Sequence, residues 1–80
     1  MSKIGYIQRY LLLIRKVRNQ PYITLDELRC EVEQELIARG EPIRSLSQRT
    51  IERDIRDIRS ALGISIDYSR SERGYFIPQD

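Results

Sequence analysis

Three helix-ending signals divide this chain into three segments of helical periodicity and a short alternating tail. Pro21 disfavours helical backbone at the residue before it, and Gly40 and Gly63 supply the left-handed conformation that ends many helices. The helical segments cover about residues 3–19, 25–39 and 48–62, and the tail covers 64–77. The tail alternates as two short strands that are not stable alone and must lie on the helices. A chain of 80 residues forms one small domain, so we expect a mainly α fold with a small β-hairpin.

The first helical segment is apolar over much of its surface. Ile7, Leu11 and Ile14 share one face, which we expect to be the core stripe. Four further residues widen that stripe: Tyr6, Tyr10, Leu13 and Val17. Leu12 points away from it and is expected to be an exposed leucine, or alternatively a contact with a second subunit or a further domain.

The second segment opens with a capping box formed by Thr24 and Glu27. Its apolar stripe consists of Leu25, Leu28, Val32 and Leu36. It is rich in acids, whereas the first segment has several cations and no acid. This asymmetry either helps the two helices pack together or leaves the first helix basic toward a ligand.

The third segment reads SQRTIERDIRDIRSALG, residues 47–63, and separates apolar from basic side chains most clearly. Ser47 is the expected N-cap, with Leu46 and Ile51 as a hydrophobic staple around it. Successive residues of an α-helix are turned by about 100° around its axis, which places the residues of this segment on a core face and an opposite face. The core face holds Ile51, Ile55, Ile58 and Leu62, and the opposite face holds Arg49, Arg53, Arg56 and Ser60.

Two interpretations of these arginines compete. In the first, they form a solvated surface with Glu52 and Asp57, in i, i+3 and i, i+4 ion pairs each worth about 0.2–0.5 kcal/mol. In the second, they enter a DNA major groove, where an arginine–guanine contact gives about 1–3 kcal/mol of discrimination. The first turn favours the second interpretation, because recognition helices read bases mainly through their N-terminal residues.

The expected DNA contacts follow from side-chain chemistry. Gln48 suits adenine and Arg49 suits guanine, while the hydroxyls of Ser47 and Thr50 suit phosphate at the helix N-terminus. The tip of the hairpin would meet the DNA backbone or minor groove. The full set of expected contacts is Ser47, Gln48, Arg49, Thr50, Arg53, Arg56, Arg70 and Arg73, with possible backbone contacts from Arg44 and Ser60.

The sequence from Leu46 onward also resembles a known family. The matching residues are Ser47, Arg49, Thr50, Ile51, Arg53, Asp54, Ile55, Gly63, Ile64, Gly74 and Tyr75. They are similar to the N-terminal winged helix-turn-helix of bacterial WYL-domain transcriptional regulators, which are related to DeoR-type domains.

The resemblance implies a sequence-specific, double-stranded DNA-binding module of a transcription factor. The single cysteine, Cys30, allows no intramolecular disulfide, so we expect a cytoplasmic protein. It also implies a homodimer or larger assembly in the full-length regulator, and a C-terminal WYL ligand-sensing domain that this sequence lacks. We therefore expect the N-terminal part of a longer regulator, with a free-standing small protein as the alternative. One departure is the connection from Gly40 to Leu46, since a tight helix-turn-helix uses a turn of about 3–4 residues.

Other function classes have less support. The chain has no histidine, one cysteine and no phosphate-cradling glycine loop, so we expect no enzyme and no cofactor. Asp54 and Asp57 are more plausible as ion-pair partners of arginines than as metal ligands, and Cys30 as a small packing residue than as a redox switch. No apolar run is long enough for a membrane span. The main alternative is a protein–protein assembly module, because residues 47–80 carry six basic and six acidic residues.

Overall fold

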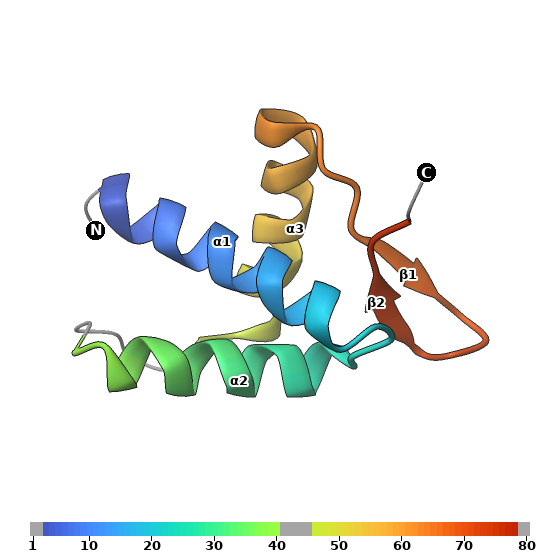
Figure 1. Ribbon diagram of the computed structural model, residues 1–80, viewed down its shortest axis with the longest axis horizontal. Coiled ribbons are helices and arrows are strands. Elements are labelled where there is room, and N and C mark those ends of the chain that lie inside the picture. The colour runs from blue at the N-terminus through green and yellow to red at the C-terminus, as the bar shows by residue number, and fades with distance from the viewer. Residues whose placement is uncertain (1–2, 41–45, 79–80) are drawn as a thin grey trace.

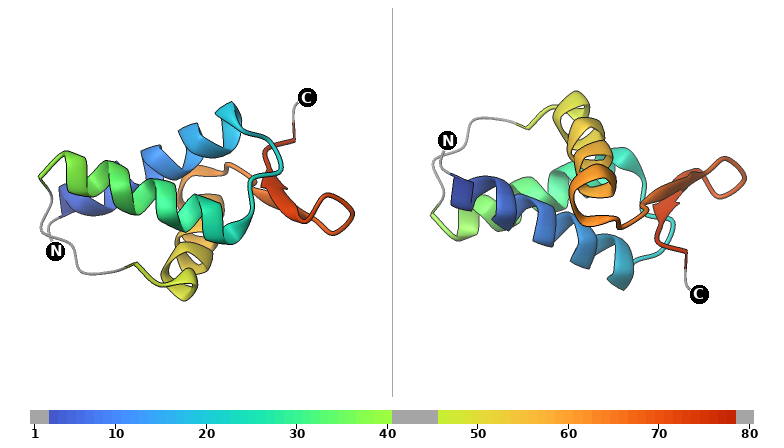
Figure 2. Two further views of the ribbon diagram at one scale, coloured as in Figure 1. Left: turned by 90° about the horizontal axis from the view of Figure 1, so that it is seen from below. Right: turned by 90° about the horizontal axis from the view of Figure 1, so that it is seen from above.

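The computed structural model describes residues 3–40 and 46–78, with side chains from Ile7 onward in the first helix. The elements follow the order α1 (Lys3–Asn19), α2 (Leu25–Ala38), α3 (Gln48–Leu62), β1 (Asp67–Ser69) and β2 (Gly74–Phe76). Helices α1 and α2 lie side by side, α3 crosses them on one side, and the hairpin sits at one end of the molecule (Figures 1 and 2). This is a winged helix layout, as the sequence predicts.

Local signals set the helix ends. Thr24 caps α2 through the predicted capping box, in which the side chains of Thr24 and Glu27 each bond the backbone N–H of the other residue. Ser47 caps α3, and Gly63 closes it with a left-handed φ of 68°. The second helix ends at Ala38, one residue earlier than predicted, with Arg39 as its C-cap.

The core gathers apolar residues from all three helices and from the segments next to the hairpin. Its fully buried centre includes Leu13, Ile23, Leu28, Ile51 and Ile58. Leu46 packs against this cluster, in agreement with the staple predicted around the Ser47 cap. Leu62, predicted for the core face of α3, is 52% exposed, so that prediction was wrong at the last turn.

The buried face of α1 differs from the predicted one. Ile7 and Leu11 are more than half exposed, whereas Leu12, predicted to be exposed, is 2% exposed and belongs to the core. Leu13 and Val17 are buried as expected, and Ile14 lies at the edge of the buried surface. The side chain of Tyr6 lies outside the described residues. An apolar helix with several possible stripes leaves its partners to decide which stripe is buried, and here α2 and α3 cover the other side.

The two strands pair antiparallel, with Tyr68 opposite Tyr75. They are shorter than the predicted 64–77 span. A third segment extends this small sheet, because the backbone of Tyr75 forms hydrogen bonds with Tyr22 (2.7 Å) and Ile23 (2.8 Å) in the α1–α2 connection. The sheet thereby fastens the hairpin to the helices, as a two-stranded ribbon requires.

Candidate nucleic-acid interface

The basic face of α3 points away from the core. Arg49, Arg53 and Arg56 are all exposed, as is Ser60 on the same face. Among the described residues, no ion pair or hydrogen bond joins any of these three arginines to a carboxylate. The ion-paired surface that was the competing interpretation is therefore not formed within the described part of the chain.

The aspartates of α3 are turned toward α1 instead. Asp54 is 1% exposed and accepts two hydrogen bonds from the guanidinium of Arg9, itself 5% exposed. Asp57 accepts a hydrogen bond of 3.3 Å from the hydroxyl of Tyr10. Two of the three acids of α3 are thus engaged on its inner side, and the outer side keeps mainly positive charge.

The first turn of α3 is arranged to receive an anion. It contains no acid, and its free backbone N–H groups and helix dipole favour negative charge there. Ser47 Oγ accepts the backbone N–H of Thr50 at 3.1 Å, and the two hydroxyls of these residues lie 3.0 Å apart. One of the two hydroxyls donates to the other, which leaves one hydroxyl proton for an outside acceptor such as phosphate. Gln48 is exposed beside them.

A shallow groove of about 220 Å³ joins α3 to the hairpin. It is lined by Glu52, Ile55, Arg56, Arg59, Ile66 and Tyr75. Arg59 forms an ion pair with Asp67 at the start of β1, so α3 and the hairpin are tied together along this groove. Burial, and to a smaller extent the nearby Glu52 carboxylate, raises the pKa of the Tyr75 phenol above its ordinary value.

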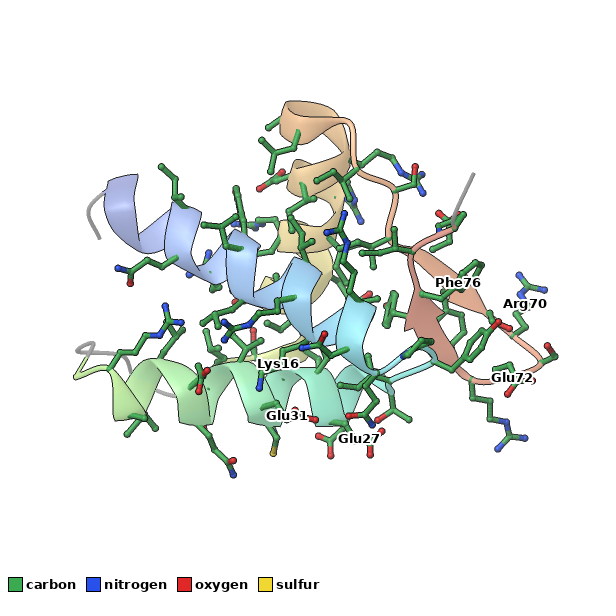
Figure 3. All side chains as sticks on the ribbon, in the orientation of Figure 1. Lys16, Glu27, Glu31, Arg70, Glu72 and Phe76 are labelled. Atoms are coloured by element: carbon green, nitrogen blue, oxygen red, sulfur yellow. The ribbon has the colours of Figure 1, made fainter. Side chains whose placement is uncertain are left out.

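The hairpin tip carries the other predicted contacts. Arg70 and Arg73 are exposed, and the structure shows no ion pair for either within the described residues. The hydroxyl of Ser69 accepts the backbone N–H of Glu72 at 3.2 Å and stabilises the turn. Arg70 and Glu72 project from the tip away from the helices (Figure 3). The tip arginines therefore form a second basic group, separate from the face of α3.

One predicted site residue is not described, and two residues that bind the aspartates of α3 were not predicted. Arg44 lies outside the described residues. Arg9 and Tyr10 were not predicted as part of the site, although Asp54 lies three residues after Ile51 and four before Ile58, the spacing of a core-facing position. That spacing could have signalled a buried Asp54, but not which cation pairs with it.

Other kinds of site find little support in the described residues. Within that part of the chain, no group of three or more acidic or cysteine side chains is placed to hold a metal ion. The helices described here are also too short or too polar to cross a membrane. Cys30 is half-buried on α2.

No family model, curated protein or solved structure matches this chain. The likeness to WYL-domain regulators therefore rests on the matching residues between Ser47 and Tyr75 alone.

Proposed function

We propose that this chain is a sequence-specific, double-stranded DNA-binding module of a bacterial transcriptional regulator of the WYL-domain type. In this proposal α3 enters the major groove and the hairpin meets the backbone or minor groove. The observation that carries it is the distribution of charge on α3. Its aspartates bond α1, and its exposed arginines Arg49, Arg53 and Arg56 have no carboxylate partner among the described residues.

Contact with DNA is energetically favoured over a solvated face for these arginines. An exposed arginine without a carboxylate partner gives up no ion pair when it binds phosphate or guanine. Gln48 and Arg49 would read base edges, and the Ser47–Thr50 pair would hold a phosphate at the helix N-terminus. Such a module would act in the cytoplasm as a dimer, with a ligand-sensing domain elsewhere in the regulator.

The test is a titration of the 80-residue chain against random-sequence duplex DNA, followed by fluorescence anisotropy at several salt concentrations. If about 5 phosphates are neutralised, log K should fall against log salt with a slope near −4.5. Sequencing the duplexes that stay bound would then give the preferred site. Absence of binding at low salt would contradict the proposal.

The second candidate is a protein–protein assembly module. The observation in its favour is a set of exposed apolar side chains outside α3, including Ile7 and Leu11 on α1. It predicts a stable oligomer without duplex affinity. Light scattering separates the two candidates, because a monomer at high concentration that binds duplex DNA fits only the first.

A further inference from the structure

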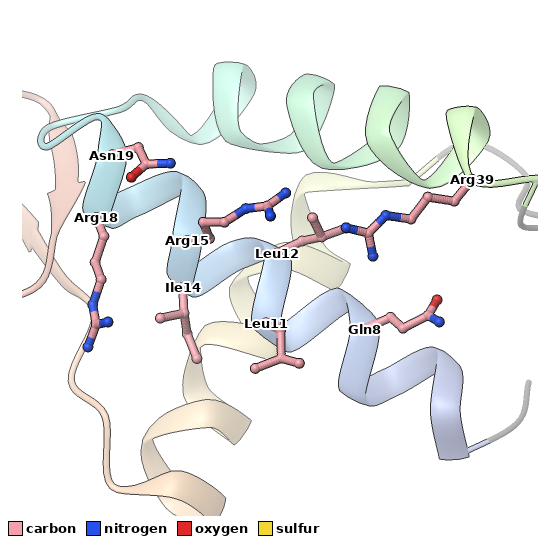
Figure 4. A pocket seen from close by; sticks show the side chains of 8 residues that line it. All are labelled: Gln8, Leu11, Leu12, Ile14, Arg15, Arg18, Asn19 and Arg39. Carbon is pink, nitrogen blue, oxygen red and sulfur yellow. The ribbon is translucent and has the colours of Figure 1, made fainter.

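A groove on the outer side of α1 has no role in the proposed DNA contact. It has a volume of about 530 Å³ and is lined by Gln8, Leu11, Leu12, Ile14, Arg15, Arg18, Asn19 and Arg39. Figure 4 shows the side chains that line it, which come from α1 and, in the case of Arg39, from the residue that follows α2. None of these lining residues belongs to α3 or to the hairpin, so the groove shares no residue with the proposed DNA contact.

Along this side, α1 presents a row of apolar side chains at helix-packing spacing. Ile7 is 55% exposed and Leu11 is 59% exposed, and they lie one turn apart. Ile14 follows three residues later at the buried edge of the same row. Residues spaced i, i+4 and i+7 form the ridge against which a second helix packs. The shape of the row therefore suits a helix rather than an extended peptide.

The charges around this row are positive. Arg15, Arg18 and Arg39 line the groove, and no acidic residue is among the described residues that line it. Arg15 forms an ion pair with Glu35 at 2.9 Å, but Arg18 and Arg39 have no ion pair within the described chain. An occupant with carboxylates would complement these arginines.

We propose that this groove docks an acidic amphipathic helix of a partner protein. Apolar residues of that helix pack on Ile7 and Leu11, and its flanking carboxylates pair with Arg18 and Arg39. A second copy of this chain fits less well, because a symmetric contact would bring two sets of these arginines together. DNA also fits less well, since aliphatic side chains gain nothing from phosphate.

The test uses a fluorescein-labelled helical peptide with leucines at i, i+4 and i+7 and glutamates on both flanks. The control peptide has lysine in place of every glutamate. The folded 80-residue chain should bind the acidic peptide at least about tenfold more tightly than the lysine peptide. Backbone amide NMR shifts should change along α1 and around Arg39, and not on the outer face of α3.

Variants locate the contact. Leu11→Ser should weaken binding of the acidic peptide about tenfold, because an exposed anchor residue is lost while the core is untouched. Arg18→Glu should reduce the preference for the acidic peptide. Ile37→Ser is the matched control, since Ile37 is 58% exposed on α2 and does not line the groove. The Ile37→Ser variant should bind the acidic peptide with the same affinity as the unchanged chain.

Several results would overturn the proposal. Equal binding of both peptides, or unchanged binding by Leu11→Ser, would remove the helix-docking role. Self-association that Leu11→Ser abolishes, without peptide binding, would assign the face to a second copy. Binding to anionic lipid vesicles that Leu11→Ser abolishes, without peptide binding, would assign it to a membrane surface. None of these results bears on DNA binding by α3, so the two proposals fail separately.

Discussion

At the scale of single residues, Arg9 and Asp54 form a buried ion pair that joins α1 to α3. Their side chains are 6% and 2% exposed, so both charges are removed from water and depend on each other. Arg9 uses two nitrogens against both oxygens of Asp54, which fixes orientation as well as distance. The pair therefore fixes how α3 is turned against α1, and with it the direction of the outer arginines.

Asp54→Asn keeps the shape of the side chain and removes its charge. We expect it to lower the free energy of unfolding by about 3 kcal/mol, because the charge of Arg9 stays buried while the charge of the carboxylate that it binds at Asp54 is lost. Urea denaturation gives the value. The matched control is Asp67→Asn, which breaks the exposed Arg59–Asp67 pair and should cost at most about 1 kcal/mol. Equal costs for the two variants would contradict the structural role given to Asp54.

Gly74 is required by a close backbone approach. A Cβ atom at this position would lie 2.0 Å from the carbonyl oxygen of Tyr22, a distance that no side chain tolerates. Gly74→Ala should therefore disrupt the hydrogen bonds that join Tyr75 to the α1–α2 connection, at a cost of about 1–3 kcal/mol. Thermal or urea unfolding checks this. Ser71→Ala at the exposed tip should change stability by less than about 0.5 kcal/mol, and a similar value for Gly74→Ala would refute the account.

At the scale of elements, two tyrosines join parts of the fold and make stability depend on high pH. Burial, together with Asp57 and Asp54, raises the pKa of Tyr10, and burial, together with Glu52 and Tyr68, raises that of Tyr75. Between the ordinary pKa of about 10 and these raised values, the unfolded chain releases phenol protons that the folded chain keeps. The stability from the neutral phenols is thus complete below about pH 10 and is lost as the pH rises through the folded values.

We expect the free energy of unfolding to fall between about pH 9 and pH 11. Tyr10→Phe combined with Tyr75→Phe should reduce that fall, because neither phenylalanine titrates. Urea denaturation at both pH values measures the effect. Parallel pH profiles for the original chain and the double variant would show that these phenols are not linked to folding.

The elements also show what the sequence could predict. Helix α3 and the ends of all three helices followed from local signals, because caps, glycines and the spacing of isoleucines act within a few residues. The buried face of α1 did not follow, since the helix carries more than one apolar stripe and its partners lie far away in the chain. The pairing of Arg9 with Asp54, 45 residues away, could not be predicted for the same reason. The backbone bridge between Ile23 and Tyr75 is likewise a contact between distant parts of the chain.

The candidate site, like the fold, was predicted from the sequence only in part. The arginines of α3 and of the hairpin tip were found from the sequence, because their positions on a helix face or a turn are local properties. The direction in which Asp54 and Asp57 point was not, because it depends on contacts with α1. That direction decides whether the arginines are paired on the surface or left for a ligand.

At the scale of the whole molecule, positive charge is concentrated on particular surfaces. The net charge is only +2, yet the outer face of α3 and the hairpin tip carry arginines that have no carboxylate partner among the described residues. A local positive face steers nucleic acid more effectively than a uniform weak charge. The α1 groove is a second, partly apolar basic surface, lined by residues of α1 and by Arg39. The proposed DNA contacts and the proposed docking groove therefore lie on different elements of the fold.

The most direct test compares two charge-matched variants on the duplex selected from the random pool. Arg53→Ala removes a cation from the outer face of α3, and Arg39→Ala removes one from the α1 groove; both residues are exposed. We predict that Arg53→Ala weakens binding to the selected duplex by about 1–3 kcal/mol and binding to random duplex by less, whereas Arg39→Ala affects neither strongly. Equal losses from both variants, on both duplexes, would contradict base reading by α3.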